Sequence, residues 1–276
     1  MTTRTLIVHS NELKTAEKVA LMIKGEIEIK NNHFRIHSIT NFEIENLRPM
    51  VEVDLNMLDQ SFDYDNIKLM VSDMDSTLIS IETIDEVASE VGLSEEVSLI
   101  TEEAMQGHLD FSESFKKRLS ILKGTASESF HEVYKNKMML NPGASELVNF
   151  FKSINIKTAL VSGGINYFAE KVKDRLDIDS FRANDVEIID GALTGKLIGR
   201  VIDAKAKAEY IEELCKHYDL QSKQVIAIGD GANDLEMMKL AGLSVAYHSK
   251  PILKKYCDIQ INFGGLDCLI DFFEKS

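Results

Sequence analysis

Four carboxylates follow two apolar runs of this sequence, and they are the side chains best suited to chemistry. Asp73 and Asp75 come directly after the run at residues 67–72, and Asp230 and Asp234 lie in the glycine-rich segment after the run that ends at Gly229. A carboxylate beside a buried strand is costly unless it is paired or binds a metal. Oxygen ligands are those that Mg²⁺ prefers. The spacing therefore indicates a magnesium site at these turns.

A third turn offers groups for an anion. Ser162, Gly163 and Gly164 end the apolar run at residues 156–162, and a helical segment follows. Small residues at the start of a helix let backbone N–H groups and a hydroxyl hold a phosphate. Lys207 would neutralise that phosphate as a point charge. Each feature alone is typical of an ordinary turn or a solvated lysine, but their placement at successive strand ends favours phosphate chemistry.

Apolar runs alternate with helical periodicity from Ile67 onward. The expected strands are 67–72, 156–162, 224–229 and 243–247, with a weaker one at 257–263, and the expected helices are 145–153, 166–176, 205–218 and 233–240. Short apolar strands separated by helices predict an α/β fold with a parallel, doubly wound sheet. Ligands of such sheets bind beyond the carboxyl ends of the strands. The three polar turns are expected there.

Two segments interrupt this alternation. Residues 83–137 contain three or four helical stretches and no strand, so they predict a helical cap inserted over the strand ends. Near residues 186–198, Asp190-Gly191 lies between two β-type runs, which is a strong hairpin signal. The helical cap and this hairpin flap are expected to close an active site.

Residues 1–65 read as a separate, small α+β accessory domain, and residues 66–276 as the main domain. A strand at 6–8, a helix at 12–22 and two alternating segments joined by Asn31-Asn32 predict a β-α-β-β unit. The remainder, as far as Asp65, looks partly like a linker. We interpret the unit as a structural accessory, with regulation or dimerisation as its alternative roles, so a homodimer is one expected assembly.

Composition narrows the classes of function. The 276 residues carry a net charge of −14, from 31 basic and 45 acidic side chains, which argues against nucleic acid as a partner. A local positive pocket still permits an anionic small-molecule substrate. The odd number of cysteines, Cys215, Cys257 and Cys268, indicates reduced thiols. No apolar stretch approaches the ~20 residues of a membrane span, so we expect a soluble, cytoplasmic protein.

From residue 67 to the C-terminus, about three quarters of the chain, the sequence resembles the haloacid dehalogenase (HAD) superfamily and, within it, the phosphoserine phosphatase family. The stretches that carry the resemblance are DMDSTLISIETIDE, AMQGHLDF, SFKKRLSILKG, ALVSGG and IGDGANDLEMMKLAGLSVAYHSKP. The resemblance implies a HAD-like Rossmannoid domain and Mg²⁺-dependent hydrolysis of O-phospho-L-serine. That reaction is the last step of serine biosynthesis.

The resemblance also implies roles for single residues. Asp73 would be the nucleophile that forms an aspartyl phosphate, and Asp75 the general acid and then the general base. Mg²⁺ would be held by Asp73, the Asp75 backbone carbonyl and Asp230, with Asp234 in support. The residues implied to hold the phosphoryl oxygens are Ser162, Gly163, Lys207 and Asn233. Thr77 would orient the nucleophile loop.

Substrate selection is expected to depend on the cap. The resemblance makes Glu82 the partner of the substrate ammonium, and Met105 and Phe111 the apolar residues that close over it. Asp110 and Glu113 predict a capping box at the start of a helix. Arg118 would then lie on the apolar stripe of that helix, where a guanidinium would bind a carboxylate bidentately or extend from the stripe's edge into water.

Other functions share some of these motifs. A related HAD phosphomonoesterase or phosphotransferase, for instance one that transfers phosphate to homoserine, would carry the same core residues. A receiver-type signalling module would lack the second aspartate and the cap. A binding protein on this scaffold would normally have lost the nucleophile or a metal ligand, and a transport ATPase would need membrane helices.

Overall fold

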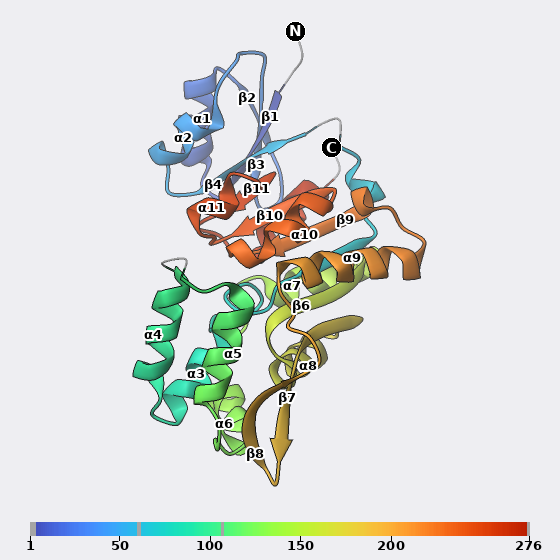
Figure 1. Cartoon of the computed structure of the whole chain (residues 1–276). Coiled ribbons are helices and arrows are strands. Elements are labelled where there is room, and N and C mark those ends of the chain that lie inside the picture. The colour runs from blue at the N-terminus through green and yellow to red at the C-terminus, as the bar shows by residue number, and fades with distance from the viewer. Residues whose placement is uncertain (1–3, 60–61, 106–107, 275–276) are drawn as a thin grey trace.

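The computed structural model describes residues 4–59, 62–105 and 108–274, and it contains two sheets (Figure 1). The larger has seven strands in the order β11-β10-β9-β5-β6-β7-β8. Its strands are β5 (Leu69–Ser72), β6 (Lys157–Ile165), β7 (Ser180–Ile189), β8 (Ala192–Ile198), β9 (Val225–Gly229), β10 (Leu243–Tyr247) and β11 (Ile259–Ile261). All neighbours pair in parallel except β7 and β8. The predicted α/β fold with a parallel sheet is confirmed.

Helices cover both faces of this sheet, which explains why its central strands are buried and mostly apolar. Every residue of β5, β9 and β10 is buried, as expected for parallel strands. The helices of this domain are α7 (Ala144–Ser153), α8 (Asn166–Leu176), α9 (Ala204–Tyr218), α10 (Leu235–Leu240) and α11 (Pro251–Lys254). Met70 belongs to the same core as α7 and α8, whereas Leu69 and Val71 pack with α9 and α10. The alternation along β5 thus divides the core into two layers.

Four helices and no strand occupy the described part of the predicted cap range, 83–137. They are α3 (Thr83–Glu90), α4 (Ser94–Met105), α5 (Phe111–Ile121) and α6 (Glu128–Asn136). In Figure 1 this group, coloured green, lies beside the β7–β8 hairpin and away from the N-terminal sheet. An isolated bridge between Ala126 and Ala192 joins the loop before α6 to the hairpin.

The hairpin is longer than the 186–198 segment predicted from the sequence. Its first strand begins at Ser180 and pairs in parallel with β6, and only its second half pairs antiparallel with β8. The predicted turn is correct, because Asp190 and Gly191 both have positive φ angles, 50° and 76°. The flap is therefore an extension of the main sheet.

The N-terminal sheet has four strands, in the order β2-β3-β1-β4. Its elements are β1 (Arg4–His9), α1 (Leu13–Ile23), β2 (Glu26–Ile29), β3 (Phe34–Ser38), α2 (Ile44–Leu47) and β4 (Asp54–Leu58). The predicted β-α-β-β unit is present, but the segment interpreted as partly linker contains β4, which pairs antiparallel with β1. The sequence obscured β4 because its buried residues include Asp54 and Asn56, and polar residues weaken a strand pattern.

Asp54 and Asn56 are buried because they bind the main domain. The Asp54 carboxylate accepts the backbone N–H groups of Asn262 (2.6 Å), Phe263 (3.0 Å) and Gly264 (2.8 Å). Asn56 accepts the Gln260 N–H at 2.9 Å and donates to the Gln260 carbonyl at 3.0 Å. The two sheets are thus joined side by side at β4 and β11 (Figure 1).

A second polar contact joins the two parts of the molecule. Asp271 in the C-terminal 3₁₀ segment lies 2.7 Å from His9 Nδ1 and 3.2 Å from His33 Nδ1. Burial alone would raise the pKa of Asp271, but the two histidines hold it below its usual value. The three cysteines are free. Within the described residues, none of the helices is long and apolar enough to span a membrane.

Candidate active site

The three polar turns meet at one edge of the sheet, because β9, β5 and β6 are neighbours and run in parallel. Asp73 follows β5, and its backbone N–H donates to the Ile228 carbonyl of β9 at 2.9 Å. The turn after β9 carries Asp230 and Asp234. Segments far apart in sequence therefore supply one site, as the strand-end positions predict.

Lys207 forms the centre of this site. Its side chain is fully buried, and its Nζ lies 2.8 Å from Asp73 Oδ1 and 2.7 Å from Asp234 Oδ1. The helix that carries it, α9, begins with the Asp203 carboxylate accepting the Ala206 N–H at 2.9 Å, which is a standard N-cap. Burial favours the neutral amine, but Asp234 and Asp73 outweigh it and raise the pKa of Lys207 above its usual value.

Three carboxylates surround this one ammonium group. Oxygens of Asp73, Asp230 and Asp234 all lie within 4.8 Å of one another. Burial and the neighbouring Asp234 raise the pKa of Asp73 well above its usual range and that of Asp230 to about 7. Buried carboxylates with too little positive charge around them form a site that a divalent cation would stabilise in its ionised form. The residues present therefore fit Mg²⁺.

Asp234 differs from the other two carboxylates because both of its oxygens are already engaged. Oδ1 accepts from Lys207, and Oδ2 accepts the backbone N–H groups of Asp230 and Gly231, each at 3.1 Å. These bonds also explain why the predicted helix at 233–240 starts late. Residues Ala232–Asp234 form a 3₁₀ turn, and α10 begins at Leu235. Asp234 supports the site from behind.

Asp75 lies on the side of the site that faces the cap. Its carboxylate accepts the Thr83 backbone N–H at 3.3 Å and the Thr83 hydroxyl at 3.2 Å. The next residue, Ser76, has a φ of 56°, a left-handed conformation that turns the chain sharply. Burial, Glu82 and Asp73 raise the pKa of Asp75 well above its usual value, which suits a group that must carry a proton near neutral pH.

The turn after β6 supplies the predicted anion-binding groups. Ser162 is fully buried, and its hydroxyl accepts the Gly164 N–H at 2.8 Å. The Gly163 carbonyl accepts from the buried Asn184 side chain at 2.7 Å. Asn233, from the turn after β9, lines the same cavity as Ser162 and Gly163. The structure therefore brings these residues together with Asp73 and Asp75.

The cap closes this cavity with α5. Asp110 and Glu113 form the predicted capping box, with bonds of 2.8 and 3.1 Å. Phe111 stacks on Phe115 with ring centroids 6.5 Å apart, and both line the cavity. The helix start thus fixes an aromatic lid over the strand ends.

Arg118 also lines the cavity, and its side chain is 12% exposed. One of its terminal nitrogens, Nη1, lies 3.4 Å from Asp85 Oδ1. Its buried Nε has no hydrogen-bond partner among the described residues. Glu82 lines the same cavity and accepts the Ser76 hydroxyl at 2.7 Å. The side chain of Met105 lies outside the described part of the chain.

Two residues that contact predicted site residues were not assigned a role from the sequence: Thr83 beside Asp75, and Asp85 beside Arg118. Gly164, predicted to belong to the anion-binding turn, also lies against Asp75. The one sequence signal that could have identified Thr83 as a site residue is its position directly after Glu82, at the start of a helix. Thr77, predicted to orient the nucleophile loop, is fully buried, and its hydroxyl has no partner among the described residues.

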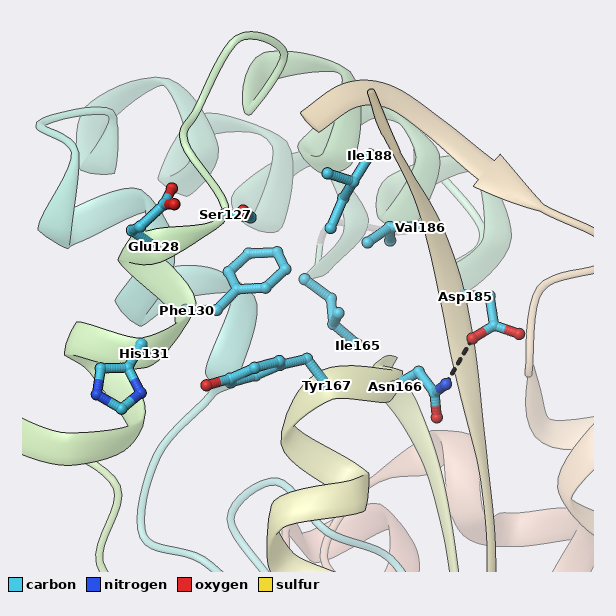
Figure 2. A pocket seen from close by; sticks show the side chains of 10 residues that line it. All are labelled: Ser127, Glu128, Phe130, His131, Ile165, Asn166, Tyr167, Asp185, Val186 and Ile188. Atoms are coloured by element: carbon cyan, nitrogen blue, oxygen red, sulfur yellow. Dashed lines mark hydrogen bonds between the residues drawn. The ribbon is translucent and has the colours of Figure 1, made fainter. Parts of the chain in front are cut away.

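The cavity at the strand ends is small, with a volume of about 40 Å³. A larger cavity of about 430 Å³ lies between α6, the start of α8 and β7 (Figure 2). Phe130, Tyr167 and Val186 line it, and Asn166 donates to Asp185 there at 2.6 Å. None of its described lining residues belongs to the carboxylate site, so the smaller cavity is the candidate active site.

Known proteins share this fold and these motifs. The model of haloacid dehalogenase-like hydrolases matches residues 67–242. A phosphoserine phosphatase of Polaromonas sp. is 45% identical over 211 residues, covering 75% of this chain and 89% of that protein. A HAD family hydrolase from Salmonella enterica matches in structure over the whole of both chains, with a TM-score of 0.90 and 28% identity. A probable phosphoserine phosphatase from Vibrio cholerae has a TM-score of 0.83 and 33% identity, covering 98% of this chain and 85% of that one.

The chain therefore belongs to the haloacid dehalogenase-like hydrolase family, as the resemblance of its motifs predicts. The similarity to Polaromonas phosphoserine phosphatase covers three quarters of this chain. The similarity to the two structures also includes the N-terminal sheet, because it covers nearly the whole chain.

Proposed function

We propose that this protein is a phosphatase that hydrolyses O-phospho-L-serine to L-serine and phosphate through an aspartyl phosphate on Asp73. One observation carries the proposal: a single small cavity is lined by Asp73 and Asp75 for phosphoryl transfer and by Glu82 and Arg118 for the two charges of an amino acid. A sugar phosphate would offer only neutral hydroxyl groups to that second pair. The similarity to phosphoserine phosphatases supports the same substrate.

Asp73 is the nucleophile in this proposal. Lys207 and the Met74 N–H both bind its Oδ1, at 2.8 and 2.7 Å. Its Oδ2 has no partner among the described residues, so we assign Oδ2 as the atom that attacks phosphorus. As the new bond from Oδ2 to phosphorus forms, the bond from phosphorus to the serine oxygen breaks. Asp75 gives its proton to that oxygen and then takes one from the water that hydrolyses the aspartyl phosphate.

Mg²⁺ is the proposed cofactor. The Asp73 carboxylate, the Asp75 backbone carbonyl and the Asp230 carboxylate would hold it, and Asp234 would support this set by fixing Lys207 and the turn that carries Asp230. A bound Mg²⁺ supplies positive charge that stabilises the phosphoryl oxygens and keeps the carboxylates ionised. Ser162, Gly163, Lys207 and Asn233 are the proposed protein contacts of those oxygens.

The cap selects the substrate in this proposal. Glu82 pairs with the ammonium group and Arg118 with the carboxylate, while Phe111 and Met105 cover the apolar part. Asp85 contacts Nη1 of the Arg118 guanidinium, and we assign the unpartnered Nε to the substrate carboxylate. A bidentate contact of this kind gives geometric specificity as well as binding energy.

The proposal extends to domains and cellular role. We divide the chain into an accessory domain (1–65) and a phosphatase domain (66–276) with its cap at about 83–137 and its flap at about 186–198. The reaction would be the last step of serine biosynthesis, in the cytoplasm, and the three free cysteines are consistent with a reducing compartment. A homodimer remains a prediction, which analytical ultracentrifugation would test.

Phosphate release from a panel of phosphomonoesters with Mg²⁺, compared between wild type and Arg118→Ala, tests the substrate. We expect wild type to prefer phosphoserine by orders of magnitude. Arg118→Ala should lose about 10- to 100-fold of kcat/KM on phosphoserine, because a charged hydrogen-bond pair is removed, and retain its activity on p-nitrophenyl phosphate. Lys116→Ala, an exposed change on the same helix, is the matched control. A flat preference would refute the substrate assignment while leaving the phosphatase core intact.

A further inference from the structure

We propose that Thr83 is the positioning residue that holds Asp75 for proton transfer to the leaving oxygen. The inference rests on the proposed function, because it requires Asp75 to be the general acid. Thr83 is the first residue of α3 and is fully buried. Its backbone N–H and its hydroxyl bind the two different oxygens of the Asp75 carboxylate, at 3.3 and 3.2 Å.

This pair of contacts fixes the plane of the carboxylate. One donor on each oxygen leaves each with a second lone-pair direction, since an ionised carboxylate has about four acceptor sites. The proton that passes between Asp75 and the substrate can use such a direction without breaking either contact. Thr83 therefore constrains the orientation of Asp75 in both of its protonation states.

Gly164 lies against the same carboxylate oxygen and against the Thr83 hydroxyl. A Cβ atom at Gly164 would lie 2.6 Å from Asp75 Oδ2, closer than real Cβ atoms come to another heavy atom. It would also lie 3.0 Å from Thr83 Oγ1, which is tighter than most Cβ contacts. Only a glycine permits the turn after β6 to approach so closely. Asp75 is thus enclosed between the cap helix α3 and the phosphate-binding turn.

The chemistry gives these contacts a role beyond packing. When Asp75 donates its proton to the serine oxygen, negative charge develops on its carboxylate. Hydrogen bonds to a charged acceptor are about twice as strong as neutral ones, so the Thr83 hydroxyl and N–H stabilise the transition state more than the protonated ground state. The start of α3 adds the positive end of a helix dipole.

The alternative is that Asp75 merely caps α3. Glu82 is the N-cap residue by position, but its side chain makes no capping hydrogen bond. Asp75 instead accepts the backbone N–H of Thr83, the first residue of this helix. A capping role would affect every substrate equally. A role in proton transfer would lower kcat/KM most for substrates whose leaving group has a high pKa, because such a group must be protonated as it departs.

The test compares Thr83→Val, which keeps the shape but removes the hydroxyl, with Thr83→Ser, which keeps the hydroxyl. For each variant, kcat/KM is measured with Mg²⁺ on phosphoserine, phenyl phosphate and p-nitrophenyl phosphate. This ratio covers the steps up to departure of the first leaving group, so it does not depend on hydrolysis of the aspartyl phosphate. The two aryl esters lack the ammonium and carboxylate, so any effect on Glu82 or Arg118 cancels between them.

We expect Thr83→Val to lose about 10- to 100-fold of kcat/KM on phosphoserine, because general acid catalysis contributes about 10²- to 10⁴-fold in all. The loss of kcat/KM should be less than about 3-fold on p-nitrophenyl phosphate, and it should be larger on phenyl phosphate than on p-nitrophenyl phosphate. Thr83→Ser should retain the wild-type dependence on the leaving group. If Thr83→Val does not fold, judged by its thermal transition, Thr83→Ala removes the hydroxyl without adding bulk.

Equal losses on all three substrates, or a Thr83→Ser variant as impaired as Thr83→Val, would overturn the inference and leave Thr83 as a structural residue. The proposed function fails by a different result. If wild type hydrolyses both aryl phosphates but not phosphoserine, the substrate assignment is wrong. Even then, a dependence on the leaving group that is steeper in Thr83→Val than in wild type would support the role of Thr83.

Discussion

Asp230 lies among buried carboxylates with little positive charge around them, and this determines how its protonation depends on pH. Burial, Asp234 and Glu82 raise the pKa of Asp230 to about 7, from an ordinary value of 3.8. Between these two values, the folded metal-free protein binds a proton that the unfolded chain does not. The stability that Asp230 contributes is therefore lost as the pH rises through this window.

We predict that Asp230→Asn raises the thermal midpoint of the metal-free protein at pH 8 by at least about 3 °C, because it removes a buried negative charge. Mg²⁺ should raise the midpoint of wild type at that pH and leave the variant unchanged. Differential scanning calorimetry with and without Mg²⁺ measures both effects. A Mg²⁺-dependent rise in the variant as large as that of wild type would contradict the role of Asp230 as a ligand.

The cap helices are the elements that must move for a substrate to enter. The cavity under α5 is small, about 40 Å³, so we expect the cap to open when a phosphorylated amino acid enters. Phe111 and Arg118 on α5, and Thr83 at the start of α3, all face the strand ends in this closed arrangement. Closure would exclude water from the first chemical step, and a partial opening would admit it for the second.

We predict that fluoroaluminate with Mg²⁺, which mimics the transferring phosphoryl group, slows amide hydrogen exchange in residues 83–137. Its binding favours the closed arrangement, so the backbone of α3 and α5 should gain protection, by at least about 10-fold at the most affected amides. Helix α1 in the N-terminal domain serves as the internal reference. Unchanged exchange in the cap would contradict gating by these helices.

At the scale of the whole molecule, the N-terminal domain is joined to the phosphatase domain by buried polar contacts. Asp54 accepts three backbone N–H groups of the main domain, and Asp271 contacts His9 and His33. Buried polar groups of this kind are costly when one partner is removed. The N-terminal domain is therefore expected to unfold together with the sheet edge at β11.

We predict that Asp54→Ala lowers the free energy of unfolding by about 2 to 4 kcal/mol, because it removes a buried carboxylate that accepts three backbone N–H groups. Urea denaturation measures the change. Glu52→Gln, an exposed charge removal two residues away, is the control and should change stability by less than about 0.5 kcal/mol. A loss for Asp54→Ala no larger than that of the control would mean that these contacts contribute nothing to stability.

The sequence by itself determined five strands of the main sheet and the members of its central site. Buried parallel strands are mostly apolar, so residues 67–72 and 224–229 stand out, and parallel strands place their carboxyl ends at a common edge. Asp73, Asp230 and Ser162 could therefore be grouped without knowing any contact. The capping box at Asp110 was equally visible, because it depends on residues three positions apart.

Only the tertiary structure decided how these groups are paired. Thr83 binds Asp75, Asp85 contacts Arg118, and β4 joins the N-terminal sheet through the buried Asp54. Such contacts join segments that belong to different elements, and they depend on the packing of helices and sheet edges. A periodic pattern of apolar residues tells which face of an element is buried, but it does not tell which polar side chain meets that face.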